Sequence, residues 1–362
     1  MKEPNTKARS RRASDRRGEV AFALLVAVLL LLNLAIFMVA IPETSNLDGG
    51  CCAPNQLLAK DFSAYYTAAW RLFHNPAQIY FHGPLNDGAP AILPEPEGYK
   101  YLPSMLLLVS PLLALPYGEA LLAFDYIQFF LLPLIAALVY LLVRDKGTLV
   151  ASGIAVAVLL LPLPLATPQW AVSASYYWQW AEGQSKVLET FLLLFSLAMA
   201  KSGRPRIAGV VFGIASFDPR FALLSLPLFL AYGSDLRKSA VYAASTILVT
   251  NLVLFYPSTL VGFVTMLFTT GLDTPPYYYS LIPMVTLVSL MVVDRKRIGA
   301  AIRGISGSDG PGSRGAPSLE GSGNDGHLSR YASERAGARH QVPSIFDTDV
   351  YRYVDYSVKG LK

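Results

Sequence analysis

A single carboxylate, Asp61, begins the stretch DFSAYYTAAW, which covers residues 61–70. If this stretch is a helix, Tyr65, Ala68 and Ala69 share the face of Asp61, because residues three to four positions apart lie on one side of a helix. Small side chains beside the carboxylate leave room for a ligand. Partial desolvation at a membrane surface raises the pKa of such a carboxylate, which suits a general base acting on a hydroxyl. A helix N-cap is the alternative role, since Asp is favoured there.

A second candidate is the tripeptide Asp218-Pro219-Arg220, in the middle of an apolar segment at 206–232. An ionised arginine at membrane depth is costly, so such a residue is usually paired or functional. An internal ion pair between Asp218 and Arg220 would fix the local fold. A guanidinium can also bind a lipid-linked phosphate. The two roles are compatible, and these residues alone do not choose between them.

The third candidate is the polar and aromatic loop QWAVSASYYWQWAEGQSK, residues 169–186. Aromatic belts at the membrane interface explain tryptophan and tyrosine residues near the ends of spans. Trp178 and Trp180 also stand close to Gln184, and flat aromatic faces beside amide groups suit a sugar. An aromatic belt and a sugar site both remain open.

The composition indicates the elements that must position these residues. Of the 362 residues, 53% are hydrophobic and only 15% are charged. Runs such as AFALLVAVLLLLNLAIFMVAI are as long as the ~20 apolar residues needed to cross a bilayer. The sequence therefore predicts an all-α, polytopic helical membrane protein.

Basic residues set the expected orientation in the membrane. The positive-inside rule places the basic tail, residues 1–19, in the cytoplasm, and the first transmembrane helix at 20–41 then leads outside. A cleaved signal peptide is disfavoured because the apolar run is too long. An outer loop is expected at 42–118 and a transmembrane bundle at 119–293. The segment 294–362, rich in Gly, Ser and Pro at its start, is expected to be a mostly disordered cytoplasmic tail of a multi-pass plasma-membrane protein.

Two apolar segments are poorly suited to crossing as single helices. Segment 102–117 is short and interrupted by prolines, so a re-entrant or interfacial element is expected. Segment 206–232 is flanked by basic residues on both sides, yet contains Asp218 and Arg220 at its centre. It is predicted to be a hairpin of two short half-helices with these residues at an outward-facing tip. Asp61, the aromatic loop and this tip should then converge on the outer face.

The other reactive residue types exclude several kinds of site. Cys51 and Cys52 are the only cysteines, and two adjacent cysteines form no metal site, whether they are thiols or a strained disulfide. His74 and His82 lack acidic or cysteine partners at ligand spacing, so no metal is expected. A glycine-rich phosphate loop and a dinucleotide fingerprint are absent from the sequence, and no cofactor is predicted. The net charge of +5 comes mostly from the N-terminal tail, which favours membrane lipids over nucleic acid as partners.

Taken in order, these motifs resemble polyprenyl-phosphate-dependent glycosyltransferases of the GT-C superfamily, most closely the alpha-mannosyltransferase-like members of glycosyltransferase family 87. The resembling residues are Asp61-Phe62 with Tyr65, IYF with Tyr80, YKYLPSMLLLVSPLLALP at 99–116, Gly183-Gln184, and AGVVFGIASFDPRFALLSLPLFL at 208–230. Their order and spacing carry the resemblance.

The resemblance implies a GT-C-like fold and a membrane hexosyltransferase. Such an enzyme transfers a hexose, here expected to be mannose, from a polyprenyl-phosphate sugar donor to an extracytoplasmic glycan or glycolipid acceptor. An Asp at the start of the first outer loop is the catalytic base in that superfamily, which implies this role for Asp61. Arg220 is expected to bind the phosphate. The expected substrate-binding residues are Tyr65, Tyr101, Gln184, Trp178, Trp180 and Asp218. The alternative is a non-catalytic transporter or flippase-like binder of lipid-linked sugar.

Overall fold

The computed structural model describes residues 6–45, 60–81, 99–160, 179–180, 182–269 and 281–306. In this part of the chain every regular element is a helix, which confirms the all-α prediction. The elements in chain order, with η marking 3-10 helices, are α1 (Thr6–Ser45), α2 (Lys60–His74), η2 (Pro76–Gln78), α3 (Ser104–Val109), η3 (Ser110–Ala114), α4 (Tyr117–Val143), η4 (Arg144–Lys146), α5 (Thr148–Leu160), α8 (Lys186–Lys201), α9 (Pro205–Ala215), α10 (Pro219–Tyr232), α11 (Leu236–Thr250), η5 (Leu252–Phe255), α12 (Pro257–Thr269), α13 (Leu281–Val293) and α14 (Arg295–Ser306).

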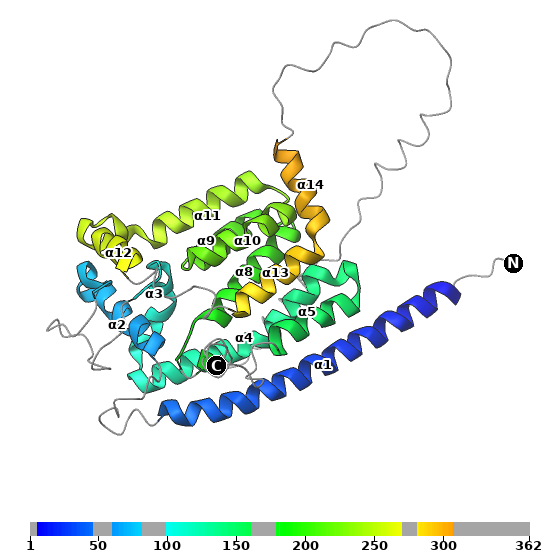
Figure 1. The fold of residues 1–362 in the computed structure, drawn as a ribbon, viewed down its shortest axis with the longest axis horizontal. Coiled ribbons are helices and arrows are strands. Elements are labelled where there is room, and N and C mark those ends of the chain that lie inside the picture. The colour runs from blue at the N-terminus through cyan, green and yellow to red at the C-terminus, as the bar shows by residue number, and fades with distance from the viewer. Residues whose placement is uncertain are drawn as a thin grey trace, which may run out of the picture. The chain divides into compact units, whose positions relative to one another are not determined.

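Within the described residues, two helical stretches are long and apolar enough to cross a membrane: Arg17–Val39 within α1, and Tyr117–Lys146, which covers α4 and η4. Helix α1 begins at Thr6, so it also includes much of the basic N-terminal segment. It packs along α4 and α5 (Figure 1). Asn33 is buried in this contact and donates a 3.1 Å hydrogen bond to the carbonyl oxygen of Leu159. This bond ties α1 to the end of α5.

The predicted hairpin is formed by two short helices, α9 and α10, and the break lies where the sequence placed it. Pro219 begins α10, because its fixed φ suits the first turn of a helix and its missing N–H is not needed there. Helix α9 approaches α11 closely through Gly209 and Gly213. A Cβ added at Gly209 would lie 2.3 Å from the carbonyl oxygen of Ser239, and one added at Gly213 would lie 2.6 Å from the Cβ of Thr246. Glycine at both positions therefore fixes the hairpin against its neighbour.

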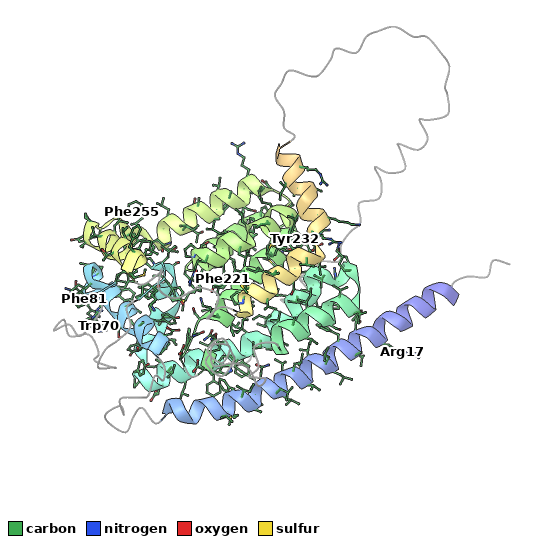
Figure 2. The ribbon with its side chains drawn as sticks, viewed as in Figure 1. Arg17, Trp70, Phe81, Phe221, Tyr232 and Phe255 are labelled. Atoms are coloured by element: carbon green, nitrogen blue, oxygen red, sulfur yellow. The ribbon has the colours of Figure 1, made fainter. Side chains whose placement is uncertain are left out.

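The predicted re-entrant segment forms the short helix α3 and the 3-10 helix η3, and α4 begins directly after Pro116. The start of α3 is anchored to the end of α11, since the Ser104 N–H donates a 3.1 Å hydrogen bond to Oδ1 of Asn251. Helix α2 packs against α3 and η3. Together with the first turns of α4 they bury an aromatic core, while Trp70 and Phe81 lie toward the edge of this region (Figure 2).

Several residues singled out in the sequence lie outside the described residues: Cys51, Cys52, His82, Trp178 and the tail beyond residue 306. The predicted boundaries of the outer loop, the bundle and the tail remain predictions.

Candidate active site

Asp61 lies in the first turn of α2 and is partly exposed. This turn is held by the loop that precedes α8, because the Phe62 N–H donates a 3.1 Å hydrogen bond to the carbonyl oxygen of Glu182. Gly183 allows the approach. Its φ is +62°, and an added Cβ would lie 2.6 Å from the Cβ of Phe62. The position of Asp61 is thereby coupled to the loop that carries Gln184.

Tyr65, one helical turn after Asp61, packs against Tyr101 with ring centroids 5.5 Å apart. Burial raises the pKa of Tyr65 well above its ordinary value, and the neighbouring Tyr101 and Asp61 act in the same direction. Burial also raises the pKa of Tyr101. The ammonium of Lys186 opposes that change, whereas the carboxylates of Asp61 and Asp218 reinforce it. Both phenols therefore stay protonated at neutral pH. Tyr101 interacts electrostatically with Lys186 of α8, Asp61 of α2 and Asp218 at the start of α10.

A buried ion-pair cluster lies next to Tyr101. The ammonium of Lys186 is 3.0 Å from Oδ2 of Asp218 and 3.2 Å from Oε2 of Glu189. It also lies 5.0 Å from the ring centroid of Tyr101, which is a cation–π geometry. The side chains of Lys186, Asp218 and Glu189 are only 3%, 1% and 0% exposed. Lys186 thus connects α8 with the hairpin tip and with the segment that precedes α3.

Arg220 and Asp218 form the internal ion pair that the sequence allowed. The guanidinium donates two hydrogen bonds to the Asp218 carboxylate, from Nε at 2.8 Å and from Nη2 at 2.6 Å. The backbone N–H of Arg220 adds a third at 3.2 Å. The Arg220 side chain is 49% exposed, whereas that of Asp218 is 1% exposed. Asp218 is therefore enclosed by its partners, while guanidinium N–H groups not used by Asp218 remain near the surface.

The segment that carries Tyr101 is bonded directly to the hairpin tip. The Leu102 N–H donates a 2.9 Å hydrogen bond to the carbonyl oxygen of Phe217, and the rings of Tyr101 and Phe217 are 6.0 Å apart. The structure thus brings Asp61 and Tyr101 together with the hairpin tip that carries Arg220. Tyr101 is the residue that lies near both Asp61 and the hairpin tip.

Trp180 lies between the two long helices, α1 and α4. Its side chain is completely buried, and its ring centroid lies 5.2 Å from that of Phe37 on α1 and 6.2 Å from that of Phe129 on α4. The tryptophan fills the space between the two long helices. Its role as a substrate-binding residue stays a prediction, and it is not used in the site proposed below.

Gln184 is close to the site but turned toward its own loop. The side chain is 3% exposed, and its Nε2 donates a 2.6 Å hydrogen bond to the carboxylate of Glu182. Gln184 therefore shapes the loop that holds the start of α2. Direct contact with a sugar would require this side chain to move.

Lys186 was not among the predicted site residues, although the sequence carried a signal for it. Lys186 and Glu189 are charged residues three positions apart at the start of an otherwise apolar helix, and such residues are rarely buried without partners. What the sequence did not contain was the partner across space, Asp218. Among the described residues, no group of three or more His, Cys, Asp or Glu side chains is placed to hold a metal ion.

Comparison with known proteins identifies the family. The model of glycosyltransferase family 87 matches residues 99–301, more than half of the chain, and this range includes Tyr101, Lys186 and Arg220. Searches of curated proteins and of solved structures gave no match. Members of this family are membrane glycosyltransferases, in agreement with the apolar helices of the bundle. The chain belongs to glycosyltransferase family 87.

Proposed function

We propose that this glycosyltransferase transfers a hexose, with mannose as the sugar, from a polyprenyl-phosphate donor to an extracytoplasmic glycan or glycolipid acceptor. The observation that carries the proposal is the arrangement around Tyr101. Asp61, which is partly exposed, raises the pKa of this phenol, and the half-exposed guanidinium of Arg220 belongs to the hairpin tip whose Phe217 ring packs against the Tyr101 ring. A base and a cation near one phenol suit a sugar phosphate and a hydroxyl acceptor.

In the proposed reaction, Asp61 accepts the proton of the acceptor hydroxyl as its oxygen bonds to the anomeric carbon of the sugar. The bond between that carbon and the phosphate oxygen breaks, and its electron pair leaves with the polyprenyl phosphate. Arg220 stabilises the negative charge that develops on the phosphate. The neutral phenols of Tyr65 and Tyr101 add hydrogen-bond donors without adding negative charge to the site.

The isoprenoid chain is proposed to lie beside α3 and α10, near the Arg220 tip. Leu107 on α3 is 43% exposed, and Leu223 and Leu226 on α10 are 69% and 40% exposed. Apolar side chains at this level suit a lipid tail whose phosphate lies at Arg220. Membrane lipids would cover the same side chains when no donor is bound.

The proposed location of the site is the outer face of the plasma membrane, with both chain ends in the cytoplasm. Helix α8 supports this orientation, because the 15 helical rises between Lys186 and Lys201 separate the two residues by about 22 Å. At the Lys201 end, Lys201 and Arg297 approach Asp145 at 3.2 and 3.9 Å. This end carries the basic residues expected on the cytoplasmic side.

The experiment that tests the function uses the purified full chain with labelled polyprenyl-phosphate mannose and a panel of glycan and glycolipid acceptors. We expect label to appear in an acceptor, with release of polyprenyl phosphate. Binding of the donor without transfer to any acceptor would favour the transporter or flippase-like alternative. Transfer from a nucleotide sugar alone would show that the proposed donor class is wrong.

A further inference from the structure

Lys186 is a fully engaged cation in the interior of the bundle. Its ammonium contacts carboxylate oxygens of Asp218 and Glu189 and lies over the rings of Tyr101 and Phe221, at 5.0 and 5.2 Å from their centroids. Figure 2 shows Phe221 among the helices of the bundle, away from its outer edges. With 2% of the residue exposed, Lys186 has no surface to offer a ligand.

Asp218 connects the buried Lys186 to Arg220, whose side chain is at the surface. Its Oδ2 accepts from both Lys186 and Arg220, at 3.0 and 2.6 Å, and its Oδ1 accepts from Arg220 Nε at 2.8 Å. Removing a carboxylate from water is costly unless opposite charge and hydrogen bonds compensate for the loss. Lys186 supplies that charge from the buried side. Asp218 can therefore remain ionised while both of its oxygens hold the guanidinium.

The contacts run from two buried side chains, Lys186 and Asp218, to the exposed side chain of Arg220. Lys186 and Asp218 are 3% and 1% exposed, whereas Arg220 is 49% exposed. A guanidinium held at two of its N–H groups by a fixed carboxylate has one orientation, and its other N–H groups then point in a fixed direction. A ligand binding there does not have to order a long flexible side chain, which reduces the entropic cost of binding.

We propose that Lys186 is a positioning residue of the donor-phosphate site, which fixes Arg220 through Asp218 and fixes Tyr101 through its cation–π contact. The inference rests on the proposed role of Arg220 as the phosphate ligand. It concerns the affinity for the donor. Lys186 itself does not touch the phosphate.

The test measures the binding of a sugar-free polyprenyl phosphate to the purified full chain in lipid nanodiscs. Lys186→Gln removes the charge but keeps a hydrogen-bond donor, and should raise Kd about 10-fold or more, the size expected for loss of a well-oriented charged contact. Lys186→Arg keeps the charge and should stay within about 3-fold of the wild type. Lys201→Gln is the matched control, because Lys201 lies at the other end of the same helix and pairs with Asp145. It should bind like the wild type.

A double-variant cycle separates positioning from a general loss of structure. If Lys186 acts through Asp218, then Lys186→Gln combined with Asp218→Asn should weaken binding no more than the more harmful single change. Independent effects of about 10-fold each would instead multiply to about 100-fold. Asp218→Asn removes the link to Arg220 but leaves Lys186 paired with Glu189, so wild-type affinity in Asp218→Asn would overturn the positioning role even if Lys186→Gln alone fails to fold.

The outcomes distinguish the two proposals. Wild-type affinity in Lys186→Gln, or multiplying effects in the cycle, would overturn the positioning role and leave the proposed function intact. A wild-type protein that binds no polyprenyl phosphate would overturn the proposed donor class, and the positioning role with it. Weaker binding in Lys186→Gln, with normal binding in Lys201→Gln, is the result that the structure predicts.

Discussion

The backbone N–H of Phe62 donates a hydrogen bond of 3.1 Å to the carbonyl oxygen of Glu182. These two residues lie far apart in the chain, and their contact joins the start of α2 to the loop before α8. Asp61 immediately precedes Phe62, and Lys186 begins α8 shortly after Glu182. The bond therefore couples the proposed base to the ion-pair cluster of the proposed phosphate site.

Gly183 tests this coupling. In Gly183→Ala the new Cβ would lie 2.6 Å from the Cβ of Phe62 and 3.0 Å from Cδ1 of Leu121, in addition to the strain of a φ of +62°. We expect a lower melting temperature and at least a 10-fold loss of transfer, since displacement of a base by about 1 Å is enough for such a loss. Transfer assays and thermal unfolding measure both effects.

Gly203→Ala is the matched control for that change. Gly203 also has a positive φ, of +75°, but an added Cβ there would meet nothing within 4 Å. It therefore carries the backbone strain without the collision. Equal losses of activity in the two variants would show that contact with Phe62 does not matter.

Arg220→Lys tests the two-bond contact with Asp218. Lysine keeps the charge but cannot donate from two nitrogens in a planar fork, so it should be held less rigidly. We expect KM for the donor to rise about 10-fold, corresponding to ~1.4 kcal/mol, with a smaller change in kcat. Arg237→Lys, at the exposed start of α11, is the control. An unchanged donor KM in Arg220→Lys would contradict a role in phosphate binding.

Buried tyrosines predict a decline in stability at alkaline pH. Burial raises the pKa of Tyr65 and of Tyr99 well above the ordinary value of about 10. Above pH about 10 the unfolded phenols lose protons that the folded phenols keep, so stability is fully present below that pH and falls as pH rises. Each such phenol lowers the free energy of unfolding by up to about 1.4 kcal/mol per pH unit. Melting temperatures measured from pH 7 to pH 11 would show the decline.

Tyr65→Phe isolates one of these phenols. The Tyr65 hydroxyl is buried beside Tyr101 and Ser185, and phenylalanine keeps the packed ring, so removal of the hydroxyl should cost about 1 kcal/mol or less at pH 7. The alkaline decline should become shallower. Tyr256→Phe is the control, because that residue is 61% exposed, and its slope should match the wild type. A Tyr65→Phe slope identical to that of the wild type would refute the assignment.

The hairpin and the re-entrant segment could be predicted because local signals agreed with one another. Prolines interrupt segment 102–117, and α3, η3 and the start of α4 follow these interruptions. The charged tripeptide inside segment 206–232 indicated a break, and α9 ends and α10 begins there. Charge, proline and length are properties of the chain itself, so no knowledge of contacts was needed.

The partners of buried charges could not be predicted in the same way. The sequence shows Lys186 and Asp218 as separate polar residues, and only the packing of α8 against α10 places them 3.0 Å apart. Trp180 shows the opposite case, since its neighbours in the sequence suggested a sugar site while its neighbours in space are Phe37 and Phe129. The type of a residue shows which interactions its side chain can make. The packing of the helices determines which partners it has.

Asp61→Asn tests the central claim most directly, because asparagine keeps the size and polarity of aspartate but its amide cannot accept a proton as a base. The control is Asp235→Asn, since Asp235 caps α11 by accepting from the Lys238 N–H at 3.0 Å. We predict that Asp61→Asn lowers the rate of transfer from polyprenyl-phosphate mannose by about 10²- to 10⁴-fold, while polyprenyl phosphate binds as tightly as before. Asp235→Asn should transfer normally. Transfer at the wild-type rate by Asp61→Asn would contradict the account.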